Sequence, residues 1–516
     1  MNRRDFLHRL GAASLAVATL GNGNMIPWPN LLDAPDPDAG IPLDSLRNAL
    51  DPNECVLLVP SDEEYTKFQN AFNLRTALQP QARVLVRSTK GVVQLVQWLK
   101  ANNVPFAIRG GGHSYEGFSQ SSSVVIDTRM MNEVSLDMPR ETVSVGAGAT
   151  LGEVYSEIGK FDLAIPAGSC PPVGVSGHTL GGGYGLLARP FGLACDNLLS
   201  VELVDATGNV LHCSDNENQD LFWALRGGGG GSFGVATRYQ FRTTRVPQVI
   251  AFNVIWVLEP VKAANVFKAW QQWIAEAPEQ ITGFMRVTAI RKRGAVRLAC
   301  SGQTVGTKRE LSAELDKILI EPPRKKDITQ LSFLGAMTKF AGPPKPPWPK
   351  NEKGNTSYAY GEYYMKGKSD FIYDVLSDDA MFALFSTMRE HPNITAVFDG
   401  YGGAVAKIAP DATAFPHRKA TASVQYVTQF DPQPLTPKFS AAMRARWESM
   451  RALYEAMAPY FTHRNGVRAA YVNYPDGDLK DYARAYWGDN LERLKKIKAA
   501  IDPDNFFQHA QSVPLA

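Results

Sequence analysis

Ile108-Arg109-Gly110-Gly111-Gly112-His113-Ser114 is the stretch from which the fold of this chain is predicted. Three successive glycines follow an apolar run, so the backbone N–H groups of this loop can approach an anion with no Cβ atom in the way. The residues before the loop predict a strand at 83–86, a helix that begins after Ser88 and ends near Asn102, and a strand at 104–108. A glycine loop in this context is suited to bind a diphosphate.

A second glycine-rich loop runs from Gly168 to Gly185 and contains Cys170. His113 at the edge of the first loop and Cys170 in the second could each form a covalent bond with a cofactor. Taken singly, each loop favours a simpler interpretation, a tight turn with a core histidine or a buried cysteine. The chain has five cysteines and no CxxC pair. This odd count argues against a zinc site and a disulfide framework, and it leaves at least one thiol free.

The composition is that of a globular protein with more than one domain. A chain of 516 residues has room for two or three domains, each with a large core. The formal net charge of +3 gives no indication of a nucleic-acid-binding surface. No partner of that kind is expected.

The first 30 residues read as a targeting segment rather than as part of the fold. Arg3 and Arg4 precede a mild apolar stretch that ends near Leu20 and is too short to span a bilayer. The segment 1–30 resembles a bacterial twin-arginine export signal, and the alternative is a basic, frayed start of a helix. We therefore expect export by the twin-arginine machinery to the periplasm or the medium. No other stretch is apolar and long enough for a membrane span.

The character of the sequence changes near Pro247. Beyond it, strand-like runs occur at 250–258, 295–301, 357–364 and 422–429, and helical runs at 263–277, 308–318 and 439–458. This pattern predicts a second domain of sheet plus helices. Its tyrosines either line a ligand groove or belong to the core; they are Tyr358, Tyr360, Tyr363, Tyr364 and Tyr401.

The two loops, in this order, resemble the berberine bridge enzyme family of bicovalent flavoproteins. The five-glycine run at 227–231 and the C-terminal Tyr471-Val472-Asn473-Tyr474-Pro475-Asp476 extend the likeness, which runs from about residue 80 to 515. The resemblance implies an α+β fold with a PCMH-type FAD-binding domain of the vanillyl-alcohol-oxidase kind, built from two α/β subdomains at 46–246. A substrate domain of antiparallel sheet plus helices would be inserted at 247–465. The segment 466–516 would complete the FAD domain.

The same resemblance implies roles for individual residues. His113 and Cys170 match the residues that bond to the 8α-methyl group and to carbon 6 of the flavin ring, so FAD is expected to be attached through both. Val173 matches the family's oxygen gatekeeper, where Val is typical of oxidases and Leu of dehydrogenases. No metal site is expected. The residues expected to bind the cofactor are His113, Cys170, Arg109, Gly110, Gly111, Gly112, Ser114, Val173, Gly174, His178, Gly181, Gly182, Gly185, Val235 and Asn473.

Four side chains are expected to be catalytic: Tyr474, Gln425, Tyr115 and Tyr184. Tyr474 matches the family's usual base, and a tyrosine needs neighbours that favour its phenolate to act as one. Gln425 falls where cyclising relatives carry Glu, and Gln cannot be a strong base, which favours simple alcohol oxidation. Ser423 stands where some alcohol-oxidising plant relatives carry Lys, so the group that tunes Tyr474 is not identified from the sequence.

These features predict an exported FAD-dependent oxidase that removes a hydride from an alcohol carbon and reduces dioxygen to hydrogen peroxide. Export, the tyrosine-rich second domain and the Gln425/Tyr474 pair suggest a mono- or oligosaccharide oxidised at its anomeric carbon. The alternatives are oxidation or oxidative cyclisation of an aromatic secondary metabolite, a dehydrogenase with another electron acceptor, and a binding protein without turnover. The sequence predicts no oligomeric state.

Overall fold

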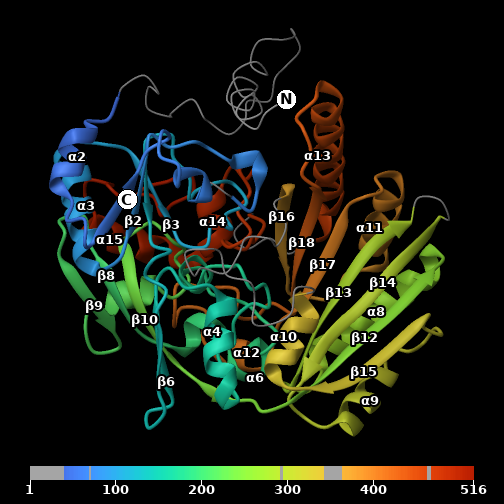
Figure 1. The fold of residues 1–516 in the computed structure, drawn as a ribbon. Coiled ribbons are helices and arrows are strands. Elements are labelled where there is room, and N and C mark those ends of the chain that lie inside the picture. The colour runs from blue at the N-terminus through green and yellow to red at the C-terminus, as the bar shows by residue number, and fades with distance from the viewer. Residues whose placement is uncertain (1–39, 69–70, 291–293, 342–362, 462–466, 516) are drawn as a thin grey trace.

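The computed structural model describes residues 40–68, 71–290, 294–341, 363–461 and 467–515 (Figure 1). The expected export signal at 1–30 lies outside the described residues, as does almost all of the strand expected at 357–364. Within the described ranges, none of the helices combines the length and the apolar character that crossing a membrane requires.

The first sheet has four strands and carries the glycine loop that decides the fold. Its order is β1 (Cys55–Leu58), β2 (Ala82–Val86), β4 (Val124–Asp127) and β3 (Phe106–Arg109). β2 and β3 run parallel to β4, and β1 is antiparallel to β2. Helix α3 (Thr89–Ala101) begins as predicted after Ser88, whose side chain accepts a hydrogen bond from the Gly91 N–H. The predicted order of strand, helix, strand and glycine loop is confirmed.

A second, five-stranded antiparallel sheet completes the first half of the molecule. Its order is β5 (Val134–Asp137), β6 (Thr142–Gly146), β10 (Val235–Arg242), β8 (Leu198–Val204) and β9 (Val210–Ser214). Its core contains side chains of α4 (Leu151–Ile158), α7 (Gln219–Ala224), α14 (Tyr482–Trp487) and α15 (Leu491–Ile501). The C-terminal helices therefore return to the half of the molecule in which the chain begins, as their position in Figure 1 shows.

The second half is built on a seven-stranded sheet in which every pairing is antiparallel. Its order is β15 (Lys325–Leu331), β12 (Val249–Leu258), β14 (Ala295–Thr304), β13 (Ile281–Ile290), β17 (Thr395–Gly400), β18 (Ala422–Phe430) and β16 (Tyr364–Ile372). Four helices contribute to its core: α8 (Pro260–Glu276), α9 (Lys308–Asp316), α11 (Asp378–Glu390) and α13 (Pro437–Met457).

One face of this sheet is covered by helices and the other faces the first half. Met285 and Val287 on β13 belong to the helix-covered core. Because successive side chains of a strand point to opposite faces, Phe284 and Arg286 project the other way. The expected α+β architecture, with an antiparallel sheet plus helices in the second half, is confirmed.

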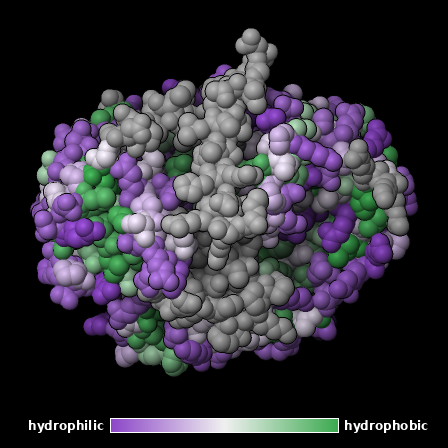
Figure 2. All heavy atoms as spheres, turned by 45° about the horizontal axis from the view of Figure 1, so that its top comes forward, coloured by the Kyte–Doolittle hydropathy of each residue, from purple (hydrophilic) through white to green (hydrophobic). Residues whose placement is uncertain are grey.

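The described surface seen in Figure 2 is largely hydrophilic, with separate hydrophobic groups among the polar residues. Large hydrophobic side chains with high exposure occur singly, such as Val261 and Phe382, each 75% exposed. Scattered exposed apolar residues are normal for folded proteins and mark no site by themselves.

Candidate active site

A cavity of about 510 Å³ lies between the glycine loops and the seven-stranded sheet. Most of its wall residues lie within 106–119, 168–186, 228–239, 284–286, 397–399, 471–475 and 507–511. Six segments that are far apart in the sequence therefore line the same cavity as the first glycine loop. A volume of this size is typical of small-molecule and cofactor sites.

The two glycine loops pack backbone against backbone at the wall of this cavity. A Cβ atom on Gly111 would lie 2.2 Å from the Gly174 nitrogen, and one on Gly174 would lie 2.3 Å from the Gly111 nitrogen. Gly112 has φ +73°, and a Cβ there would meet the Arg109 guanidinium at 2.6 Å. No side chain fits at these positions, so bare main chain lines the cavity. Such a cradle fits the diphosphate and flat ring system of FAD.

Both residues expected to be tethers lie in the wall of this cavity. The His113 ring stacks on Phe72 with centroids 4.3 Å apart. Burial, together with the Arg109 charge, lowers the pKa of His113 to about 3, so its imidazole is neutral and keeps a lone pair. Cys170 is an exposed free cysteine, whereas the other four cysteines are buried. The geometry gives Cys170 the access to the cavity that a covalent bond with a cofactor requires.

Tyrosines gather at the side of the cavity that faces the sheet. The Tyr474 and Tyr115 rings are parallel, with an interplanar angle of 2° and centroids 5.9 Å apart. The Gln425 amide donates a hydrogen bond of 2.8 Å to the Tyr115 hydroxyl. The Tyr184 hydroxyl donates to the Gly400 carbonyl at 2.9 Å. All four side chains expected to be catalytic therefore lie in or directly behind one wall.

Asp399 is the acidic partner of Tyr474. The Tyr474 hydroxyl donates a long hydrogen bond of 3.5 Å to its Oδ2 atom. Burial raises the pKa of Asp399 to about 7, while the Arg286 charge and the Tyr474 hydroxyl oppose this rise. Burial, and next the Asp399 charge, raise the pKa of Tyr474 well above its usual value. Tyr474 is therefore protonated near neutral pH, and it can take a proton from another group only if its own proton passes to Asp399 in the same step.

Asp399 and Arg286, which are not expected from the sequence, both line the cavity. They lie on β17 and β13, strands that the sequence pattern did not single out. The sequence does contain a signal for Asp399, which is a charged residue inside a strand-like run. Ala396 and Phe398 are apolar core residues at alternate positions, and Asp399 comes directly after Phe398.

Most of the expected cofactor-binding residues line the cavity, and five expected site residues do not. Those in the wall are Gly110, Gly111, Gly112, His113, Ser114, Tyr115, Cys170, Val173, Gly174, His178, Tyr184, Gly185, Asn473 and Tyr474. Those outside it are Arg109, Gly181, Gly182, Val235 and Gln425. Gln425 reaches the site only through the Tyr115 hydroxyl. Gly181 supports Asn473, because a Cβ there would lie 2.1 Å from the Asn473 amide oxygen.

His178 and Asn473 fasten the second loop to the C-terminal segment. The His178 Nε2 atom accepts a hydrogen bond of 3.0 Å from the Gly168 N–H, and burial lowers the pKa of His178 to about 4. The Asn473 amide donates to the His178 carbonyl at 2.8 Å. These contacts make His178 a neutral residue that shapes the loop around Cys170.

Of the five tyrosines considered for a groove in the second domain, two belong to the core. Tyr364 and Tyr401 are 6% and 1% exposed and pack in hydrophobic clusters. Tyr363 is described but is absent from the cavity wall, and Tyr358 and Tyr360 lie outside the described residues. The groove residues that the structure provides are instead Phe284, Phe340 and Val397. Within the described ranges, no cluster of His, Cys, Asp and Glu is arranged to hold a metal ion.

The chain is similar to known flavoproteins over most of its length. Residues 80–214 match the family model described as FAD binding domain, and residues 470–514 match the model Berberine and berberine like. The FAD-linked oxidoreductase YgaK of Bacillus subtilis is 31% identical over 467 residues, which cover 89% of this chain and 96% of YgaK.

Two plant relatives show the same similarity. The monolignol oxidoreductase AtBBE-like 13 of Arabidopsis thaliana is 33% identical over 434 residues, which cover 79% of this chain and 78% of that protein. The solved structure of Physcomitrella patens BBE-like 1 superposes with a TM-score of 0.81 at 30% identity, covering 91% of this chain and 99% of that one.

Proposed function

The chain belongs to the berberine bridge enzyme-like family of FAD-dependent oxidoreductases, and from that premise we propose that it is an oxidase acting on an alcohol carbon. The observation that supports this most is the Tyr474–Asp399 pair, which lies in the wall of the cavity that also contains His113 and Cys170. A proton acceptor and a cofactor cradle around one space are the two parts that alcohol oxidation needs.

His113 and Cys170 would hold FAD by covalent bonds, with the backbone of Gly111 and Gly174 against it. When bound, FAD would supply the acceptor for the substrate's hydride, and dioxygen would be the final acceptor of the two electrons and would leave as hydrogen peroxide. Two attachment points fix the position of the cofactor in an otherwise open cavity. An open cavity is compatible with large substrates because a tethered cofactor cannot dissociate.

Tyr474 takes the proton of the substrate hydroxyl while its own proton passes to the Asp399 carboxylate. The alcohol thereby loses one proton and one hydride and becomes a carbonyl compound. Arg286 favours the ionised form of Asp399 before the transfer. Tyr115 is oriented by the Gln425 amide and lies parallel to Tyr474, where its hydroxyl binds a neighbouring substrate oxygen. General base assistance of this kind contributes roughly 10²- to 10⁴-fold to a rate.

A mono- or oligosaccharide oxidised at its anomeric carbon is the first substrate class of this proposal. The hydroxyls of Tyr115, Tyr474 and Tyr184, with Asp399 and Arg286, give the sheet side of the cavity several hydrogen-bonding groups that suit a polyhydroxylated ring. The second candidate is an aromatic alcohol, favoured by the similarity to a protein named monolignol oxidoreductase. The apolar Phe284 and Phe340 in the wall are compatible with it.

Dioxygen as acceptor and export are further parts of the proposal. Val173 lies in the cavity wall, where its small side chain would leave dioxygen a path to the cofactor. Replacing it with the larger Leu should slow peroxide formation while substrate oxidation under anaerobic conditions stays within about twofold. Arg3 and Arg4 support export of the folded, cofactor-loaded protein by the twin-arginine machinery.

Peroxide release by the purified holoenzyme, measured against a panel of sugars and aromatic alcohols, tests this function. We expect peroxide with a sugar, and we expect Tyr474→Phe to lower the rate at least about 100-fold. Peroxide only with aromatic alcohols would select the second candidate. Anaerobic reduction of the flavin without peroxide in air would identify a dehydrogenase. Full activity of Tyr474→Phe would contradict the assignment of the base.

The covalent attachment is tested by denaturing the holoenzyme in acid and measuring the mass of the protein. We expect the flavin to stay with the chain in the wild type and in each of the single variants His113→Ala and Cys170→Ala. The double variant should release it. Release of the flavin from the denatured wild type would exclude both tethers, and release from one single variant would assign the attachment to the residue replaced there.

A further inference from the structure

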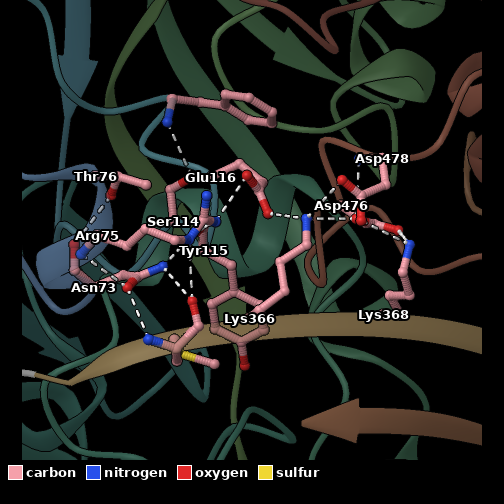
Figure 3. A network of polar contacts seen from close by, with 12 residues as sticks. Asn73, Arg75, Thr76, Ser114, Tyr115, Glu116, Lys366, Lys368, Asp476 and Asp478 are labelled. Carbon is pink, nitrogen blue, oxygen red and sulfur yellow. Dashed lines mark hydrogen bonds and ion pairs between the residues drawn. The ribbon is translucent and has the colours of Figure 1, made fainter. Parts of the chain in front are cut away.

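A cluster of charged side chains lies at the edge strand of the seven-stranded sheet, beside Tyr115 (Figure 3). We call it the bridging cluster, and its members are Arg75, Glu116, Lys366, Lys368, Asp476, Asp478 and Arg451. Five of these side chains are at most 5% exposed. Charges removed from water in this way attract their partners more strongly than surface pairs do, and they are kept only where each has a partner.

Lys366 lies on β16 and pairs with acidic residues from two segments outside this strand. Its Nζ atom lies 2.8 Å from the Glu116 Oε1 atom and 2.7 Å from the Asp476 Oδ1 atom. Glu116 directly follows Tyr115, and Asp476 comes two residues after Tyr474. One buried ammonium therefore holds the segments that carry the two parallel tyrosines.

Further contacts tie Tyr115 to the same strand. Its carbonyl accepts hydrogen bonds from the Asn73 amide at 2.6 Å and from the Arg75 guanidinium at 2.9 Å. Its ring packs on Gly367, where a Cβ atom would lie 3.2 Å from the ring. Gly367 lies between the two lysines of β16. The strand is therefore linked to Tyr115 through the Tyr115 ring, through the residues that bind the Tyr115 carbonyl, and through the side chain of Glu116.

Lys368 provides an internal comparison. It is as buried as Lys366, and its Nζ atom lies 2.5 Å from Asp476 and 3.3 Å from Asp478. It has no contact with Glu116 among the described pairs. Lys368 therefore fastens only the Tyr474 side, whereas Lys366 spans both sides.

We propose that Lys366 is a positioning residue that sets the spacing and parallel alignment of Tyr115 and Tyr474 by bridging Glu116 and Asp476. The proposal rests on the proposed function of Tyr474 as the base. The separation of the two rings decides whether one substrate can present its reacting hydroxyl to Tyr474 and a neighbouring oxygen to Tyr115. Small errors in such positions are costly to rates even when binding persists.

The test compares two charge-balanced double variants, each of which removes one cation and one anion from the bridging cluster. Lys366→Met with Glu116→Gln cuts the bridge, and Lys368→Met with Asp478→Asn leaves it intact. We expect the first to slow flavin reduction by the donor at least tenfold with less than a twofold change in KM, and the second to slow it less than twofold. Equal losses in both, or a full rate in the first, would overturn the proposal.

A double-mutant cycle separates positioning from general destabilisation. In a Tyr115→Phe background, where the hydroxyl to be positioned is absent, cutting the bridge should cost less than twofold. If the losses multiply instead, Lys366 does not act through Tyr115 and the proposal fails.

Crystal structures of both variants provide a readout that needs no substrate. The ring pair should depart from its parallel arrangement only where the bridge is cut, and an unchanged pair would overturn the proposal. If Tyr474→Phe is fully active, the base assignment fails, yet these structures still decide whether Lys366 positions the two rings.

Discussion

At the scale of single residues, Asp399 takes part in the proposed proton transfer, and its burial also lowers the stability of the folded protein when it is ionised. Burial raises the pKa of its carboxyl to about 7 in the folded protein, from an ordinary value of 3.8. Between these pH values the folded state binds more protons than the unfolded state, so the stability that this group contributes falls as the pH rises from about 4 to 7. Above pH 7 the carboxylate is ionised, which is the form that accepts the proton of Tyr474.

We therefore predict opposite effects of Asp399→Asn on rate and stability. The rate of flavin reduction should fall about 10- to 100-fold and lose its rise through pH 7. At pH 8 the variant should be more stable than the wild type by on the order of 2 kcal/mol, and at pH 4 the two should be equal. Stopped-flow reduction and urea unfolding at both pH values check this.

Asp374→Asn is the control for that prediction, because Asp374 is exposed and lies on the loop before α11. It should change neither the rate nor the pH dependence. A wild-type rate in Asp399→Asn would show that Tyr474 works without a carboxylate, and a loss of stability at pH 8 would show that the ionised form of Asp399 is satisfied by its surroundings.

At the scale of elements, the two glycine loops act as one unit because each excludes a side chain from the other. Gly111→Ala would place a methyl group 2.2 Å from the Gly174 nitrogen, a main-chain atom that cannot turn away. We predict a protein with less than half of the wild-type FAD content and a free energy of unfolding lower by about 2 kcal/mol. The ratio of flavin to protein absorbance after purification measures the first effect.

Gly159→Ala is the matched control. Gly159 has φ −65°, which any residue adopts, and its Cβ would meet Leu334 at 3.5 Å, an ordinary contact. This variant should purify with full FAD content. Full FAD content in Gly111→Ala as well would mean that the loops can separate without losing the cradle.

The elements that could be predicted from the sequence are those with a local signal. Helix α3 was predicted because Ser88 caps it and its buried residues recur at helical spacing. Strands β13 and β17 were missed, because β13 carries Gly283 and Arg286 within its run and β17 has only six residues. Their pairing with each other joins residues more than 100 positions apart, as when Arg286 faces Val397. Asp399 was missed with the strand that carries it.

At the scale of the whole molecule, the contacts between the two halves also have no local signal in the sequence. The glycine loops and the C-terminal motif could be assigned to one site from the family resemblance. The contacts that join the FAD-binding half to the sheet could not, because they are made by ordinary residues at irregular spacing. Arg189 of helix α6 (Ala188–Phe191) is an example: its side chain is 1% exposed, and its guanidinium bonds to main-chain carbonyls.

The Arg189 guanidinium donates to main-chain carbonyls of the second half. It bonds to Ile281 at 2.7 Å, to Ile274 at 3.0 Å and to Ala277 at 2.6 Å, and also to Tyr401. Five residues earlier, Tyr184 bonds to the carbonyl of Gly400, the neighbour of Tyr401. The wall of the cavity and the junction of the two halves are thus held by one short stretch of chain.

We predict that Arg189→Met lowers the free energy of unfolding by on the order of 3 kcal/mol, because it leaves buried carbonyls without donors. The midpoint of urea unfolding, followed by tryptophan fluorescence, measures this. Arg140→Met is the control, since Arg140 is 77% exposed and pairs only with Asp137, and it should change stability by less than about 0.5 kcal/mol. The variant at Arg189 should also raise the KM of the donor, because β13 and β17 carry Arg286 and Asp399 into the cavity from the half that Arg189 fixes. Unchanged stability and KM together would mean that Arg189 does not help to hold the sheet on the FAD-binding half.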